Sequence, residues 1–188
     1  MVKESPAIHR KRRASRPLDA ASLEELALAY VARFATSAAK LEGYLARKLR
    51  ERGWAEGEAI VDIPGLVERY AARGYVDDAA YARMRAGSLL RRGYGSRRIG
   101  QALGAAGIGE DVREDVLPDA GERRQAALVM ASKRRIGPFG AEPPDPARRE
   151  KQIAAMLRAG HELGDALALV DAESTDAAED WAQEAEGE

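Results

Sequence analysis

The part of this sequence best suited to chemistry is RRGYGSRRIG, residues 91–100, in which two arginine pairs flank a Gly-Tyr-Gly-Ser turn. Gly93, Gly95 and Gly100 do not have the G-x-G-x-x-G spacing of a dinucleotide-binding loop, and no Gly-Lys-Ser/Thr follows. The glycines instead fit a helix end and a tight turn, with Ser96 as the cap of the next helix. We therefore interpret the segment as a helix joint that carries cationic side chains.

The four arginines of this segment differ in how well local structure explains them. Arg91 and Arg92 end one predicted helix, where the helix dipole favours a cation. Arg97 and Arg98 open the next, where the same dipole disfavours cations by a few tenths to about 1 kcal/mol. Residues that break a local rule often belong to functional sites, so this mismatch favours a functional role for Arg97 and Arg98. Tyr94 either packs between helices or stacks on a base or an arginine.

No other group of side chains fits a catalytic or metal site. The Asp77-Asp78 pair is best explained as a helix cap before Tyr81. His9 and His161 lie in different contexts, and the absence of cysteine excludes disulfides and thiolate sites. No apolar run approaches a membrane span, and no signal-peptide h-region follows the N-terminus. We predict a cytoplasmic protein that is not an enzyme, has no metal or other cofactor, and does not bind membranes.

Charge is distributed unevenly along the 188 residues, although the net charge is −1. Residues 1–160 hold 30 basic and 21 acidic residues, a net charge of +9, while the last 28 residues carry −10. A basic body indicates an anionic partner, because neutralised phosphates release counterions. The acidic end either shields that body or keeps the protein soluble.

The pattern of apolar residues is helical from Ser22 onward, and Ser22 with Glu25 predicts a capping box. Abundant alanine and only 5% aromatic residues favour helical packing over sheets. A 54-residue repeat relates LARKLRERGW (45–54), IGQALGAAGI (99–108) and IAAMLRAGHE (153–162). The glycine of the third copy, Gly160, lies one place early. The predicted core residues follow this register: Leu45, Leu49, Tyr81, Leu89, Ile99, Leu103, Ile153 and Leu157.

The repeat predicts an all-α fold, an elongated tandem array of three three-helix repeats that resemble helix-turn-helix units, with flexible termini. We place the repeats at 21–75, 76–120 and 121–171. Residues 1–20 are predicted to be a disordered basic arm and residues 172–188 an acidic flexible tail. Each repeat is too small for a large core, so neighbours must share apolar faces.

The segment YVDDAAYARMRAGSLLRRGYGSRRIGQALGAAGI, residues 75–108, resembles the RecX family of bacterial proteins that modulate the RecA recombinase. The family pattern has Asp-Asp-x-x-Tyr-Ala, a basic helix, Arg-Gly-Tyr-Gly-x-x-x-Ile and a Leu-x-x-x-Gly ending. The likeness covers roughly residues 23–170 and is weakest in the third repeat. The residues that match the pattern are Asp77, Asp78, Tyr81, Ala82, Arg92, Gly93, Tyr94, Gly95, Ile99, Leu103 and Gly107.

This resemblance implies a non-enzymatic regulator that binds RecA and lies in the groove of the RecA filament on single-stranded DNA. Such a protein would modulate, and by the usual family effect inhibit, the recombinase, ATPase and coprotease activities in DNA repair and the SOS response. Gly93, Gly95 and Ser96 would form the turn that presents the binding surface. The predicted binding residues are Arg91, Arg92, Tyr94, Arg97, Arg98, Arg83, Arg85, Arg47, Lys48 and Arg50.

A second class of function stays open from the sequence, a direct DNA-binding protein built of stacked helix-turn-helix units. Such a protein would bind naked DNA with a steep salt dependence, whereas a filament regulator would depend on RecA. Weak direct contact with DNA is also compatible with the regulator. We expect a monomer, because an open-ended repeat array with polar ends has no need to self-associate.

Overall fold

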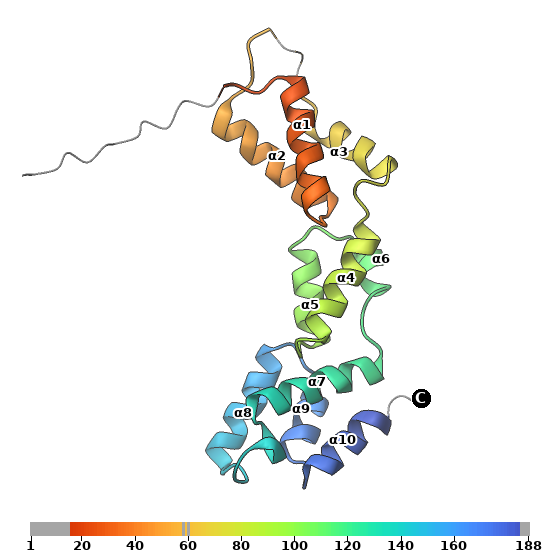
Figure 1. Cartoon of the computed structure of the whole chain (residues 1–188). Helices are drawn as coiled ribbons and strands as arrows, with labels where there is room; N and C mark the ends of the chain where they lie inside the picture. Colours follow the sequence, from red (N-terminus) through yellow and green to blue (C-terminus); the bar gives the residue numbers. More distant parts are fainter. Residues whose placement is uncertain (1–15, 58, 60, 185–188) are drawn as a thin grey trace, which may run out of the picture.

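The computed structural model describes residues 16–57, 59 and 61–184. Among these residues the chain forms ten α-helices, one short 3-10 helix and no strand longer than an isolated bridge between Leu18 and Trp54. The helices form three groups that follow one another along an elongated molecule (Figure 1). The predicted all-α fold is confirmed. No helix in the described ranges is long and apolar enough to cross a membrane.

The first group contains α1 (Ala20–Arg33), α2 (Ala38–Arg52) and α3 (Ile63–Ala72). The capping box of α1 is formed by Asp19 and Ser22, three residues before the predicted one: Ser22 N donates to Asp19 Oδ1 at 2.8 Å, and Asp19 N donates to Ser22 Oγ at 3.0 Å. Leu18 is fully buried, and its N–H donates to Gly53 O at 2.9 Å. The arm predicted over 1–20 is therefore ordered from residue 16, and its residues 1–15 lie outside the described ranges.

The second group contains α4 (Asp78–Leu90), α5 (Ser96–Gly104) and α6 (Glu110–Glu114). Asp77 caps α4 by accepting from Ala80 N at 2.8 Å. Apolar residues of α4 and α5 are buried against each other because helical spacing puts them on facing sides. The predicted core residues buried here are Tyr81, Leu89, Ile99 and Leu103.

The third group contains α7 (Ala120–Arg134), the 3-10 helix η1 (Gly137–Phe139), α8 (Pro146–Arg158) and α9 (Leu163–Val170). Its core holds Met156, which is fully buried, whereas Ile153 is only partly buried. Leu157 is also half-exposed and does not pack in that core, so its predicted core role is wrong. The reason is the shifted glycine. In the second repeat the buried residue Leu103 lies four residues before Gly107, and in the third repeat the residue four before Gly160 is Met156.

A tenth helix, α10 (Thr175–Glu184), lies along α7 (Figure 1). Ala178 and Ala182 are fully buried there, and Arg124 Nη1 donates to Trp181 O at 3.0 Å. The prediction of a flexible tail is therefore wrong for residues 175–184, while residues 185–188 lie outside the described ranges. The physical reason is that Ala178, Trp181 and Ala182 share one helix face, which buries apolar surface despite the acidic composition.

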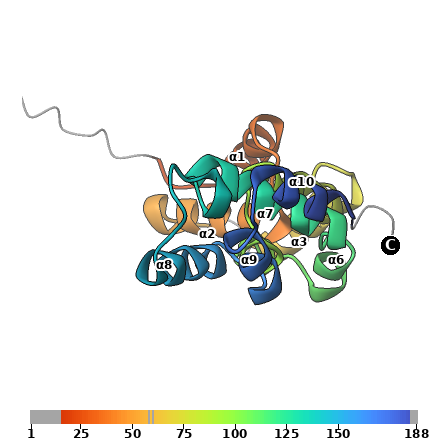
Figure 2. The same ribbon diagram turned by 90° about the horizontal axis from the view of Figure 1, so that it is seen from below.

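The middle helices of the three groups meet end to end. The C-terminal end of α8 contacts the N-terminal end of α5, and the C-terminal end of α5 contacts the N-terminal end of α2. We call α8, α5 and α2 together the middle-helix column. It runs along one side of the molecule in Figure 1, and the view from below again places α2 and α8 on a common side (Figure 2). The joint between α8 and α5 positions five of the ten predicted binding residues, which are Arg91, Arg92, Tyr94, Arg97 and Arg98.

Candidate partner-binding surface

The joint between α8 and α5 is built on backbone contacts. Gly95 N donates to Ala159 O at 3.1 Å, and Arg97 N donates to Gly160 O at 3.2 Å. A Cβ on Gly95 would lie 2.3 Å from Gly160 O, so only glycine permits this approach. The turn at residues 93–96 thus connects two repeats as well as two helices.

Arg97 has a structural partner in the same joint. Its Nη2 donates to Leu157 O at 3.0 Å, at the C-terminal end of α8. The negative end of the α8 dipole therefore faces the start of α5, which removes the electrostatic mismatch seen in the sequence. Arg97 stabilises the joint, so its place at the start of α5 has a structural explanation, and its contact with a partner stays a prediction.

The other residues of the turn also differ from the sequence-based assignment. Gly95 is the N-cap of α5, which has no side-chain cap; Ser96 is the first helical residue, and its buried Oγ has no hydrogen-bond partner among the described residues. Gly93 has φ +84°, and a Cβ there would lie 2.9 Å from Met130 N. Tyr94 is half-buried between the second and third cores, with the Arg92 guanidinium 5.5 Å from its ring centroid. Tyr94 therefore packs in the joint, and Arg92 covers its ring.

The joint between α5 and α2 repeats this arrangement with side chains. Ser37, the N-cap of α2, donates through Oγ to Ala106 O at 2.6 Å. Asp78 Oδ1 accepts from Ala38 N at 2.8 Å, so this aspartate caps α2 as well as opening α4. Lys40 Nζ donates to Tyr81 Oη at 2.6 Å. The Asp77-Asp78 pair is thus a double cap, one carboxylate for each of two repeats.

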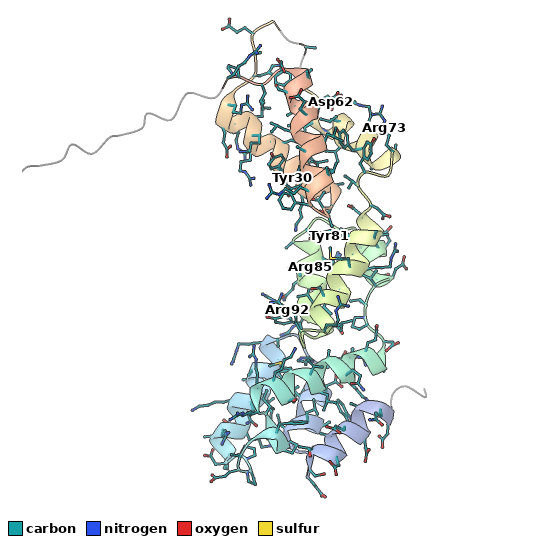
Figure 3. All side chains as sticks on the ribbon, viewed as in Figure 1. Tyr30, Asp62, Arg73, Tyr81, Arg85 and Arg92 are labelled. Atoms are coloured by element: carbon teal, nitrogen blue, oxygen red, sulfur yellow. The ribbon has the colours of Figure 1, made fainter. Side chains whose placement is uncertain are left out.

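The remaining predicted binding residues fall into two classes. Arg47 and Lys48 both lie near Glu51, with Lys48 Nζ 2.7 Å and Arg47 Nε 3.7 Å from its carboxylate. Figure 3 places Arg85 and Arg92 on the middle repeat, with Arg92 nearer the third repeat. Within the described ranges, no hydrogen bond, ion pair or ring contact forms at the side chains of Arg50, Arg83, Arg85 and Arg98.

Basic residues concentrate on the middle-helix column. Its helices α2, α5 and α8 contain eleven basic and three acidic residues, whereas the third helices α3, α6 and α9 contain two basic and five acidic residues. In each repeat the column helix is thus more cationic than the third helix, although α7, with four basic residues and one acidic residue, equals α8. Sequence reasoning missed the contribution of α8, although Arg148, Lys151 and Arg158 recur at helical spacing.

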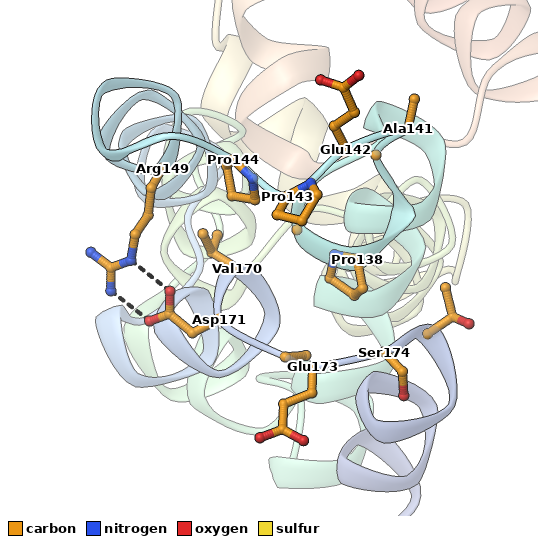
Figure 4. A pocket seen from close by; sticks show the side chains of 14 residues that line it. Pro138, Ala141, Glu142, Pro143, Pro144, Arg149, Val170, Asp171, Glu173 and Ser174 are labelled. Atoms are coloured by element: carbon orange, nitrogen blue, oxygen red, sulfur yellow. Dashed lines mark hydrogen bonds and ion pairs between the residues drawn. The ribbon is translucent and has the colours of Figure 1, made fainter.

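A hollow of about 490 Å³ in the third repeat is not part of this surface. It is lined by Pro138, Pro143 and Pro144 and by the pair Arg149 and Asp171 (Figure 4). Arg149 Nε and Nη2 each donate to one carboxylate oxygen of Asp171 at 2.5 Å, and this bond lowers the pKa of Asp171. The two charges therefore satisfy each other. In the described ranges no three His, Cys, Asp or Glu side chains gather as a metal site would require.

His161 lies buried at the joint between α8 and α5, with its Nε2 3.1 Å from Gly93 O. Burial lowers the pKa of His161 below its ordinary 6.5, against the opposing effects of the Gly93 carbonyl and the Asp165 carboxylate. The unfolded chain therefore takes up this proton first as the pH falls. The stability that neutral His161 contributes is complete above pH 6.5 and is lost as the pH falls from there towards the folded-state pKa.

We expect the free energy of unfolding to decrease by up to about 1.4 kcal/mol per pH unit below the unfolded-state pKa because of His161. Urea unfolding between about pH 8 and about pH 5 measures this slope. His161→Gln keeps a donor for the Gly93 carbonyl but cannot titrate, so its slope in this range should be smaller. Equal slopes in the two proteins would show that His161 does not couple the joint to pH. Asp165, whose pKa burial raises, acts with the opposite sign as the pH falls towards 3.8, and charge on His161 is one of the influences that lower its pKa.

Comparison with known proteins agrees with this geometry. A family model described as the second three-helix domain of RecX matches residues 77–117, which span α4 to α6. A RecX regulatory protein from Myxococcus xanthus is 33% identical over 157 residues, covering 79% of this chain and 84% of the relative. One from Thermus thermophilus is 39% identical over 110 residues, covering 58% of this chain and 71% of the relative.

Two solved structures show that the fold is shared. A structure of regulatory protein RecX has a TM-score of 0.63 at 20% identity and covers 81% of this chain and 71% of its own. RecX from Lactobacillus salivarius has a TM-score of 0.58 at 17% identity, covering 89% of this chain and 97% of its own. With the motif at residues 77–117 and the match to the Myxococcus protein over most of both chains, this chain belongs to the RecX family of regulatory proteins.

Proposed function

We propose that this chain regulates RecA by binding in the groove of the RecA filament on single-stranded DNA, and that binding inhibits the filament. The observation that carries this proposal is the middle-helix column, whose three helices lie along one side of an elongated molecule and together contain eleven basic and three acidic residues. A long cationic side fits a long anionic groove better than it fits a compact partner. Charge complementarity of this kind raises association rates and fixes orientation.

Arginines of α4 and of the turn after it, which pack beside the column helix α5, would add central contacts to those of the column. Arg83, Arg91 and Arg92 are exposed, and a guanidinium can form paired hydrogen bonds with a carboxylate or a phosphate. The two joints hold the neighbouring repeats in a fixed relation, because each is closed by several hydrogen bonds. Inhibition would then follow from binding energy alone, by opposing the changes in filament geometry that accompany its activity.

Duplex DNA recognition by stacked helix-turn-helix units is less well supported. That mode places a recognition helix in the major groove, where basic and polar side chains read the bases. The helix at the corresponding third position is only five residues long in the second repeat, with three acidic residues. In the third repeat it is α9, which has no basic residue. Neither helix has the length and charge for that role.

The test follows ATP hydrolysis by the cognate RecA on single-stranded DNA while this protein is added. The native protein should inhibit at amounts well below one molecule per RecA. In Arg83/Arg91/Arg92→Ala the half-inhibiting concentration should rise about tenfold, since three exposed contacts of about 0.5 kcal/mol each are lost. Arg97 is left intact because it closes the joint.

The charge-matched control is Arg33/Arg69/Arg73→Ala, which removes three exposed arginines from α1, from α3 and from the C-cap of α3. It should inhibit as the native protein does. Equal loss in both variants would mean that net charge, and not the middle repeat, sets binding. A native protein without effect on RecA would overturn the proposed function itself.

A further inference from the structure

Two adjoining hollows lie along α8, beside the joint of the second and third repeats. One, of about 230 Å³, is lined by side chains of α5, α7 and α8 and by Tyr94. The next, of about 250 Å³, lies between the end of α7 and the first half of α8. They share Arg134 and Ala155, so they form one continuous depression. We call it the arginine trough, after its cationic residues Arg98, Arg134, Arg135, Arg148, Lys151 and Arg158.

The trough concentrates positive charge without compensation. Neither hollow has an acidic residue in its lining, and none of the six cations forms an ion pair with any residue in the described part of the chain. Nearby arginines behave differently: Arg149 pairs with Asp171, and Arg123 Nε lies 3.5 Å from Glu162. The six trough cations are all exposed, so their charges are available to a ligand.

The trough is assembled from three helices by the fold. Arg148, Lys151, Ala155 and Arg158 follow one face of α8 at spacings of three and four residues, and the small Ala155 leaves the depression between longer side chains. Arg134 ends α7, Arg135 is its cap with φ +55°, and the joint adds Arg98 from α5. Like charges three residues apart destabilise a helix by a few tenths of a kcal/mol. The cluster therefore weakens the free protein, as expected of a binding site.

We propose that the arginine trough binds the phosphate backbone of a single-stranded nucleic acid. From Arg148 to Arg158 the α8 face is about 15 Å long. This length matches about four phosphates at their spacing along a duplex strand, and fewer in a stretched strand. A nucleic acid strand brings regular negative charge and no cations, which suits a lining without acids. An acidic protein surface also carries basic residues, and the six cations of the trough would repel them.

Tyr94 favours a single strand over a duplex. Its ring is half-buried in the joint with Arg92 against it, and it also lines the end of the trough beside Arg98 and Arg158. Aromatic rings and arginine planes beside a basic groove are where unpaired bases stack, at about 1–3 kcal/mol per base. Arg98, Arg148, Lys151 and Arg158 also belong to the middle-helix column, so the trough shares cations with the proposed RecA contact. Binding of a nucleic acid there nevertheless needs no RecA.

The experiment measures binding of a fluorescent oligothymidine to the full chain by anisotropy, with no RecA present. The native protein should bind, with affinity falling steeply as salt rises. Arg98/Arg134/Arg158→Ala removes three phosphate contacts, so the slope of log K against log salt should fall in magnitude by about 2. Affinity in about 0.1 M salt should fall about 100-fold.

The matched control is again Arg33/Arg69/Arg73→Ala, which has the same net charge as the trough variant and should bind as the native protein does. Circular dichroism verifies that both variants are folded. The proposal is overturned if the native protein does not bind, if both variants lose affinity equally, or if polyglutamate or duplex DNA competes as well as unlabelled oligothymidine. Inhibition of RecA by a chain that does not bind oligothymidine would reject the trough and leave the regulator assignment standing.

Discussion

Gly95→Ala is expected to lower the free energy of unfolding by about 2–3 kcal/mol and to loosen the joint between the second and third repeats. The added Cβ would lie 2.3 Å from Gly160 O and 2.4 Å from His161 N, which are backbone atoms that cannot rotate away. Relief requires α5 and α8 to separate. Separation would break the hydrogen bonds from Gly95 N and Arg97 N to the end of α8. The effect is thus both steric and cooperative.

The measurement is thermal unfolding followed by circular dichroism, where a loss of this size corresponds to about 5–10 °C for a chain of this length. Hydrogen exchange at the Arg97 amide reports the joint itself and should become faster. Gly100→Ala is the matched control, because it lies in the same helix and a Cβ there meets nothing within 4 Å. It should stabilise the protein by about 0.5–1 kcal/mol. Equal midpoints of thermal unfolding for Gly95→Ala and Gly100→Ala would contradict the close contact between Gly95 and the Gly160 backbone.

The sequence was sufficient to predict the helices of the repeats. It was insufficient to predict which residues of the third repeat are buried. Helical spacing of apolar residues and glycine positions are local signals, so α4 and α5 could be placed from the motif at 75–108. The third copy gave two conflicting signals, since Leu157 kept the 54-residue spacing and Gly160 did not. The structure follows the glycine, because the chain must leave the helix there with φ +96°. Met156 consequently takes the buried position.

The candidate site shows what local reasoning cannot provide. The sequence shows that Arg97 and Arg98 begin a helix, but not that the carbonyl groups ending α8 lie opposite. Arg97 therefore has a structural role in the joint, whereas Arg98 lines the arginine trough. Arg134 and Arg158 join it from helices of another repeat. Such a cluster depends on which helix ends meet, which is a property of the tandem packing and not of any one segment.

The acidic C-terminal region was also misjudged by composition. Net charge and the lack of large apolar residues are typical of a disordered tail. Two alanines and one tryptophan, however, form an apolar face narrow enough to pack on α7. The acidic residues Asp176, Glu179 and Asp180 are exposed beside it. Segment-averaged charge does not detect a face made of small residues.

Ala178→Glu is expected to detach α10 from α7. Ala178 is fully buried, and a carboxylate cannot remain unpaired in that contact without a cost of several kcal/mol. Release of the helix exposes Ala182 and the partly buried ring of Trp181, whose centroid lies 5.0 Å from the Arg124 guanidinium. We expect a loss of about 2–4 kcal/mol in the free energy of unfolding, since the apolar contact of α10 is forfeited. A red shift of tryptophan emission measures the detachment.

Ala177→Glu is the control, because it adds the same charge to the adjacent residue, which is exposed. A carboxylate in the first turn of a helix is favoured by the dipole, so this variant should be as stable as the native protein or slightly more so. Trp54 packs against the first core, whereas α10 packs against the third, so Trp54 contributes the same emission in both variants. Identical emission and stability for Ala178→Glu and Ala177→Glu would mean that α10 contributes nothing to the third repeat. A shift confined to Ala178→Glu would establish the acidic segment as a fourth helical layer of that repeat.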